Sequence, residues 1–183
     1  LRSLVGSDMC IRDRYYEATT DQPTVVNMTN HTYFNLSGDL NNTIDESILY
    51  VNADSYTPAD NTYMPTGEVR PVEGTVFDFR TPKAIGTDFS SGNPEIEGAG
   101  GGYDHNWCLN TKGNETKVCA TLSDPRSGIK MDMYTNEPGV QCYTANFQDG
   151  TRPGKGGILY QKHCAICLES QKLSLIHISE PTR

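Results

Sequence analysis

Apolar and polar residues alternate with a period of two along several short stretches of the chain. In residues 128–136, Ile129, Met131 and Met133 fall on one face of an extended strand. Residues 117–124 show the same alternation, and the turn-forming sequence Asp-Pro-Arg-Ser-Gly separates the two stretches as in a β-hairpin. Because side chains alternate across a strand, this pattern predicts two antiparallel strands with one apolar face.

The same type of pattern recurs over most of the chain. Further strands are expected at 15–20, 24–29, 33–36, 47–53, 103–110, 139–144 and 163–169, each bounded by Gly, Pro, Asn or Asp. No stretch shows the 3.6-residue apolar stripe of an amphipathic helix. Residues 54–102 are expected to form long loops. We therefore predict an all-β fold, a large sandwich of antiparallel sheets.

Composition agrees with this fold and limits the partners. The 183 residues include 17 Gly, 10 Pro and 10 Tyr, which is typical of a turn-rich β protein. The net charge of −8 argues against nucleic acid and against an anionic membrane, because both attract clustered Lys and Arg. No apolar run approaches the length that spans a bilayer.

The cysteines do not form a recognisable metal motif. Cys164 and Cys167 make a C-x-x-C pair, but no second pair and no H-x₃₋₅-H follows it, as a structural zinc site would need. In a strand the two side chains would point to opposite faces. We expect buried free thiols and no metal.

The sequences at both ends of the chain resemble translated adapter DNA and not natural protein. Residues 173–183 (LSLIHISEPTR) match the translation of a DNA that resembles a transposase-type sequencing-library adapter. Residues 4–14 resemble the forward adapter translated in another frame. We therefore expect residues 1–14 and 173–183 to be adapter-like, and residues 15–172 to be the natural part.

Three polar residues lie inside segments that are otherwise strand-like and partly apolar: His31, Asp104 and Glu169. Glu169 directly follows Cys-Ala-Ile-Cys-Leu, where a carboxylate is costly to bury without a partner. Burial raises the pKa of a carboxyl group, which is one way to obtain a general base near neutral pH. A glutamate at a strand end that faces water explains the same stretch equally well.

The histidines leave similar alternatives open. His31 stands between polar residues just before Tyr33 and Phe34, which suits either a hydrogen-bonded structural histidine or a proton carrier. Asp104 and His105 are neighbours in a predicted strand, so their side chains point in opposite directions. One of the two would line a site and the other would pack inside, and the spacing does not choose between them.

Four stretches taken together resemble the aldose 1-epimerases, in the same order along the chain. They are residues 24–38 (TVVNMTNHTYFNLSG), 102–109 (GYDHNWCL), 136–150 (NEPGVQCYTANFQDG) and 154–171 (GKGGILYQKHCAICLESQ). The resemblance implies an antiparallel β-supersandwich, here incomplete, with residues 15–172 as the C-terminal part of the epimerase domain. An arginine and a second histidine that line the family's cleft would lie upstream of this part.

The resemblance also implies the roles of four residues. His31 would be the catalytic acid and Glu169 the catalytic base, while Asp104 and Gln141 would contact the sugar. The implied activity is interconversion of the α and β anomers of free aldohexoses such as galactose or glucose, with no cofactor and no metal. The partner would be a monosaccharide substrate, with no nucleic acid and no membrane, and a cytoplasmic location is expected rather than a periplasmic one.

Two other functions stay open at this point. A glycoside hydrolase could use Asp104 and Glu169 as its carboxylate pair. A non-catalytic carbohydrate-binding sandwich could have kept the cleft without turnover, although retention of both His31 and Glu169 argues against it.

The epimerase interpretation makes geometric predictions. His31, Asp104, Gln141 and Glu169 should converge on one face of one sheet, around a concavity that fits one pyranose. His31 and Glu169 should face each other across it, too far apart for a direct hydrogen bond. The adapter-like ends should pack against nothing in that sheet, and the fragment should be inactive by itself.

Overall fold

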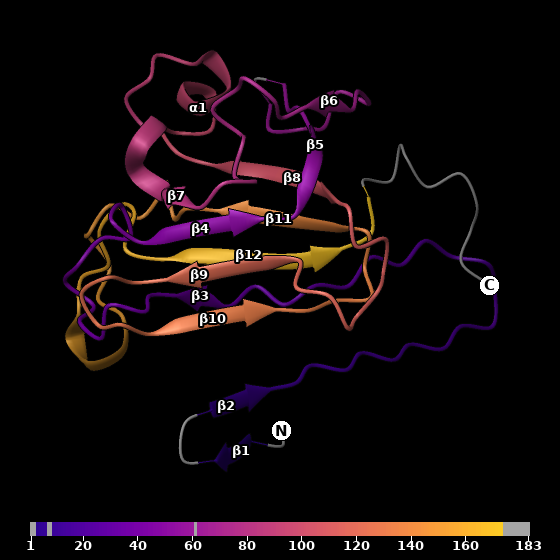
Figure 1. The fold of residues 1–183 in the computed structure, drawn as a ribbon, viewed down its shortest axis with the longest axis horizontal. Helices are drawn as coiled ribbons and strands as arrows, with labels where there is room; N and C mark the ends of the chain where they lie inside the picture. The colour runs from indigo at the N-terminus through magenta and orange to yellow at the C-terminus, as the bar shows by residue number, and fades with distance from the viewer. Residues whose placement is uncertain (1–2, 7–8, 61, 174–183) are drawn as a thin grey trace.

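The computed structural model describes residues 3–6, 9–60 and 62–173. Within these ranges the main body of the chain consists of a six-stranded and a four-stranded antiparallel sheet that pack against each other (Figure 1). The prediction of an all-β antiparallel fold is therefore confirmed. None of the helices in the described part of the chain has the length and apolar character needed to cross a bilayer.

The larger sheet has six strands and carries the candidate residues. In spatial order they are β3 (Tyr33–Phe34), β12 (Ile166–Gln171), β11 (Gly139–Tyr143), β8 (Asp104–Leu109), β5 (Ala53–Thr57) and β6 (Arg70–Pro71). The smaller sheet has the order β10 (Lys130–Met133), β9 (Ala120–Ser123), β4 (Ile48–Val51) and β7 (Lys83–Ala84).

The hydrophobic core lies between these two sheets. Trp107, Val140 and Leu168 of the larger sheet join Leu49 and Leu122 of the smaller one in a single buried cluster. The Trp107 indole N–H donates to the carbonyl oxygen of Phe77 at 2.9 Å, so the one polar atom of that ring is satisfied inside the core. The larger sheet consequently has one face fixed against the core and the other free for a site.

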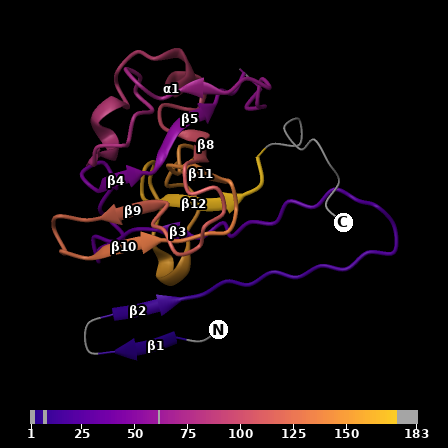
Figure 2. The same ribbon diagram turned by 45° about the vertical axis from the view of Figure 1, so that its right-hand side comes forward.

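A second, small element stands apart from the sandwich. Strands β1 (Ser3–Gly6) and β2 (Met9–Arg12) pair only with each other within the described residues. Both views show this hairpin separated from the two sheets, joined to β3 by a long extended segment (Figures 1 and 2). The sequence predicts that the N-terminal residues 1–14 pack against nothing in the larger sheet. For residues 3–6 and 9–14, the pairing of β1 with β2 alone agrees with this prediction.

The prediction of strands at 15–20 and 24–29 is wrong. These residues belong to the extended segment and are mostly exposed, with no ladder partner. Local alternation favours an extended backbone, but a strand also needs a neighbour that accepts and donates its hydrogen bonds.

The loop-rich section 54–102 also contains more structure than predicted. Besides β6 and β7 it forms a 3₁₀ turn (Ile85–Asp88) and the short helix α1 (Pro94–Gly98), and a second 3₁₀ turn lies further on, at Lys155–Gly157. The Asn93 side chain accepts hydrogen bonds from the backbone N–H groups of Glu95 and Ile96, and Pro94 occupies the first position of α1. Five residues are too few to show a 3.6-residue stripe, which explains why the pattern missed this helix.

His105 is the member of the Asp104–His105 pair that packs inside. Its ring lies 4.7 Å from the ring of Phe77, and its Nδ1 accepts a hydrogen bond from the backbone N–H of Asp104. Desolvation by burial lowers the pKa of His105 to about 4. The imidazole is therefore held neutral at physiological pH.

This burial predicts an acid-sensitive fold. The unfolded chain binds the His105 proton below an ordinary pKa of 6.5, whereas the folded chain does so only near 4. The free energy of unfolding should therefore fall as the pH drops from 6.5 to 4, with a contribution on the order of 2 kcal/mol between pH 7.5 and pH 5. Urea unfolding at the two pH values, in the wild-type chain and in His105→Gln, measures it. An equal loss in both proteins would show that His105 is not the cause.

Candidate active site

The strand registers arrange the candidate residues in a row across the larger sheet. Glu169 of β12 lies opposite Gln141 of β11, and Gln141 lies opposite Asn106 of β8. Extending the β3–β12 register two residues beyond Tyr33 brings His31 opposite Glu169. Directly opposed residues in antiparallel strands project to the same face. The row His31–Glu169–Gln141–Asn106 is therefore a consequence of pairing.

A second row runs beside the first on the same face. Tyr33 lies opposite Cys167, and Tyr143 lies opposite both Cys167 and Asp104. These residues are two positions from members of the first row, so their side chains share its face. The prediction that His31, Asp104, Gln141 and Glu169 converge on one face is confirmed.

His31 and Glu169 are in direct contact. The Nε2 atom of His31 lies 3.2 Å from Oε1 of Glu169. The prediction that they stand too far apart for a hydrogen bond is wrong, because opposed positions on paired strands bring their side chains within a few ångströms. The His31 side chain is 50% exposed and that of Glu169 only 10%, so the imidazole covers the carboxylate.

The environment of Glu169 suits a proton acceptor. Desolvation raises the pKa of Glu169, the charge of His31 opposes the rise and the Asp104 carboxylate adds to it. A buried carboxyl group with one partly exposed partner can titrate closer to neutral pH than an ordinary glutamate. Glu169 therefore faces the site rather than bulk water.

A chain of amide groups holds Asp104 beside this pair. Gln141 Nε2 donates to Asp104 Oδ1 at 2.8 Å, and Gln171 Nε2 lies 3.4 Å from Gln141 Oε1 and 3.3 Å from Asn106 Oδ1. Desolvation raises the pKa of Asp104, while the hydrogen bond from Gln141 lowers it. Sequence reasoning did not single out Asn106 and Gln171, although period-two spacing from Asp104 and Glu169 places them on the same face.

Aromatic rings border the histidine. The His31 ring is stacked on Tyr33 with a centroid distance of 5.1 Å, and it meets the edge of Tyr143 at 6.0 Å. Burial raises the pKa of both tyrosines, so their hydroxyl groups stay protonated at neutral pH. The rings supply flat apolar surfaces next to the polar row.

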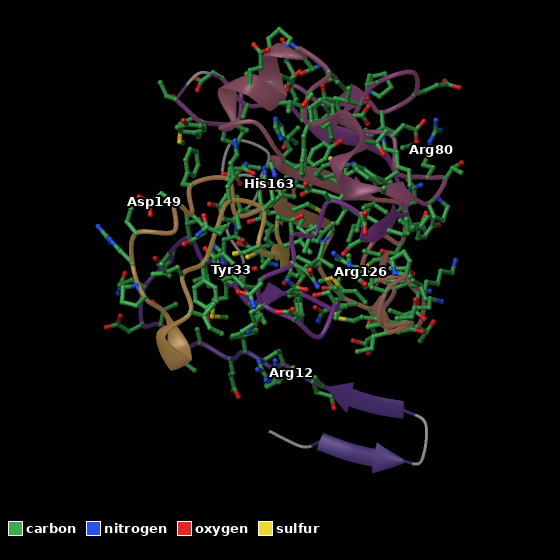
Figure 3. The ribbon with its side chains drawn as sticks, turned by 90° about the vertical axis from the view of Figure 1, so that its left-hand side faces the viewer. Arg12, Tyr33, Arg80, Arg126, Asp149 and His163 are labelled. Atoms are coloured by element: carbon green, nitrogen blue, oxygen red, sulfur yellow. The ribbon has the colours of Figure 1, made fainter. Side chains whose placement is uncertain are left out.

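A cavity of about 350 Å³ lies at the Tyr33 end of this face. Its lining consists of Tyr33, Asn35, Leu40, Gln148, Tyr160, Cys164 and Ala165. Figure 3 shows Tyr33 on the same side of the molecule as the loop that carries Asp149. Gln148, which lines the cavity, directly precedes Asp149 in the sequence. The lining does not include the four candidate residues, so a concavity centred on them stays a prediction.

One of the terminal residues touches the sheet. A methyl carbon of Leu173 lies 3.3 Å from the position that a Cβ on Gly139 would occupy. The prediction that residues 173–183 pack against nothing in the sheet is therefore wrong for Leu173, while residues 174–183 lie outside the described part. Gly139 precedes Gln141 by two positions on β11 and pairs with Gln171 of β12. Leu173 therefore lies on the site face, at the edge next to Gln171.

Five cysteines are free thiols, as predicted: Cys108, Cys119, Cys142, Cys164 and Cys167. Cys167 is fully buried, and its pairing with Tyr33 and Tyr143 places it on the site face of the sheet. Its Sγ, a His31 ring nitrogen and a Glu169 oxygen all lie within 4.8 Å of one another. The sequence pattern gave no sign of this grouping, because it combines a loop residue with two positions of β12.

The fold and the site define a class of protein: an antiparallel sandwich with an imidazole–carboxylate pair and polar ligands on one open face. The family model for aldose 1-epimerase matches residues 10–179. The chain belongs to the aldose 1-epimerase family.

Individual relatives give the same result. The chain is 45% identical to the galactose mutarotase of Homo sapiens over 170 residues, which is 92% of this chain and 46% of the relative. It is 37% identical to the aldose 1-epimerase of Escherichia coli K12, with 86% of this chain and 44% of that protein covered. The chain thus spans about half the length of the curated relatives it matches.

Solved structures agree with the fold. The GalM/aldose epimerase homologue from C. elegans superposes with a TM-score of 0.70 at 29% identity, over 84% of this chain and 44% of that one. Galactose 1-epimerase from Lactobacillus acidophilus superposes with a TM-score of 0.68 at 31% identity, over 83% and 42%. The predicted galactose mutarotase-like sandwich is confirmed.

The hydrogen bond between Gln141 and Asp104 can be tested directly. Gln141→Leu removes the donor that lowers the pKa of Asp104, so that pKa should rise further above its ordinary value. An NMR titration of the aspartate carboxyl carbons in the 183-residue chain measures the shift. The exposed Gln22→Leu serves as a matched control and should leave the titration unchanged, whereas an unchanged or lower pKa in Gln141→Leu would contradict the assigned contact.

Proposed function

We propose that the protein to which this chain belongs is an aldose 1-epimerase that interconverts the α and β anomers of free aldohexoses. The observation that carries the proposal is the pairing of His31 with Glu169 at 3.2 Å, on the face that also holds Asp104 and Gln141. The names of the relatives, galactose mutarotase and aldose 1-epimerase, support galactose as one substrate. No cofactor or metal takes part in the proposed reaction.

The proposed chemistry is a reversible ring opening. Glu169 removes the proton of the O1 hydroxyl, a C1–O1 double bond forms, the C1–O5 bond breaks, and protonated His31 gives its proton to O5. The aldehyde end then turns about the C1–C2 bond. On closure His31 takes the O5 proton back while Glu169 returns its proton to O1, so no proton is gained or lost overall.

The short distance between the two groups is compatible with this sequence. Both reacting oxygens of a hemiacetal are bonded to the same carbon, so an acid and a base that lie side by side can each reach one of them. Typical proton-transfer contacts are about 2.6–3.2 Å between heavy atoms. The exposed imidazole can turn outward by a side-chain rotation, whereas the buried carboxylate stays fixed by β12.

Asp104 and Gln141 are proposed to hold the sugar hydroxyl groups. A carboxylate accepts hydrogen bonds and an amide both donates and accepts, so the pair matches hydroxyl groups, which do both. Gln141 is already oriented by Asp104 and Gln171, which reduces the ordering needed on binding.

Substitution of the two proposed proton carriers is the main test. In a full-length family chain that contains these residues, Glu169→Gln should nearly abolish mutarotation, because an amide does not accept the O1 proton. His31→Asn should slow it by about 10² to 10⁴. Polarimetry on freshly dissolved α-D-galactose gives the rate.

Matched controls separate these roles from loss of the fold. His163→Asn and Glu68→Gln change the same residue types away from the proposed site and should keep the wild-type rate. Near-normal rates in both Glu169→Gln and His31→Asn would overturn the proposal.

The pH profile offers a second test. Because the pKa of Glu169 is raised, the rate should fall on the acid side at a higher pH than an ordinary glutamate would give. Asp104→Asn removes one cause of the rise, so this acid limb should move to lower pH even though the variant is slower. A limb that stays in place or moves upward would show that Asp104 does not act on Glu169.

A further inference from the structure

Three different metal-binding side chains meet on the site face. Cys167 precedes Glu169 by two positions on β12, and His31 reaches the same spot from the neighbouring segment. One atom of each, a sulfur, a nitrogen and an oxygen, lies within 4.8 Å of the other two. These are the three atom types that bind zinc in proteins.

We propose that His31, Cys167 and Glu169 form a binding site for Zn²⁺, and that the bound ion blocks the face by occupying both proton carriers. The site does not involve the C-x-x-C partner Cys164, which lines the neighbouring cavity. Binding of the ion does not depend on the proposed function, whereas its inhibitory consequence rests on it.

The spacing of the pair fits tetrahedral coordination. With zinc bonds of about 2.0–2.1 Å to nitrogen and oxygen, two ligand atoms at a tetrahedral angle stand roughly 3.3 Å apart. The Nε2 of His31 and Oε1 of Glu169 are 3.2 Å apart, so these two atoms already have the required separation. The Cys167 sulfur lies within 4.8 Å of both other ligand atoms, on the same face of the sheet.

Access to the site comes from the histidine side. The His31 side chain is 50% exposed, while Cys167 is fully buried and Glu169 nearly so. An ion that arrives at the imidazole can therefore pass to the carboxylate and thiol as the ring turns. Three protein ligands leave a fourth position for a water molecule.

Binding should be coupled to proton release. Zinc binds the thiolate form of cysteine, so the Cys167 sulfur gives up its proton on binding. Because all three ligands must be deprotonated to bind zinc, the affinity should be higher at pH 7.5 than at pH 6.5. Mg²⁺ and Ca²⁺ prefer oxygen ligands and should not compete.

The experiment is metal titration of the 183-residue chain by calorimetry, with Zn²⁺ and then Mg²⁺, at pH 6.5 and 7.5. Cys10→Ser and His177→Asn are introduced first to remove other ligands of the same type. Co²⁺ replaces Zn²⁺ in a parallel titration, because a cobalt–thiolate bond gives an intense near-ultraviolet absorption band. We expect one Zn²⁺ per chain, no binding of Mg²⁺, and the cobalt band.

Variants assign the ligands. Cys167→Ser should abolish the cobalt band and weaken Zn²⁺ binding at least tenfold, while the matched control Cys164→Ser should change neither. His31→Asn replaces a half-exposed ligand, so it should weaken binding similarly without the risk to the fold that a buried substitution carries.

The proposal is overturned if the chain binds no Zn²⁺ at millimolar concentration, if the cobalt band is absent, or if Cys167→Ser or His31→Asn binds like the wild type. If the protein binds zinc but has no mutarotase activity, the proposed function is contradicted and the zinc site is not. Mutarotase activity without zinc binding would contradict only this inference.

Discussion

The pairing of β12 with a strand on each side is the constraint on which the site depends. Its register with β11 sets Gln141 beside Glu169, and its register with β3 sets His31 on the other side. A slip of one residue would turn Glu169 into the hydrophobic layer and expose Leu168 in its place. The burial of Leu168 against the smaller sheet therefore fixes the direction of the carboxylate.

Burial acts differently on the two faces of this sheet. On the core face it keeps His105 neutral and packs it against Phe77, so that histidine is structural. On the site face it raises the pKa of Glu169 and of Asp104, which are close enough to influence each other. Desolvation thus keeps a histidine neutral on one side and raises the pKa of two carboxyl groups on the other.

The contact between His31 and Glu169 changes how the site is understood. An acid and a base that touch can act on two oxygens of one carbon, and the same closeness lets both of them bind a single ion together with Cys167. The thiol contributes a third ligand type that the proposed reaction does not use. The site therefore combines proposed proton transfer with the capacity for metal inhibition.

The sequence by itself determined the fold class and the apolar faces of the two strands at 117–124 and 128–136, because period-two alternation records which side of a strand is buried. It also pointed to His31, Asp104 and Glu169, since polar residues in apolar segments need a purpose. Apart from the hairpin of 117–124 with 128–136, it did not determine which segments pair. Strands were therefore wrongly predicted at 15–20 and 24–29, and the predicted separation of His31 and Glu169 was wrong. The strand pattern left open whether Asp104 or His105 faces the site. The tertiary structure decided for Asp104, as the resemblance implied, and it added Cys167, because register and packing depend on residues far apart in the chain.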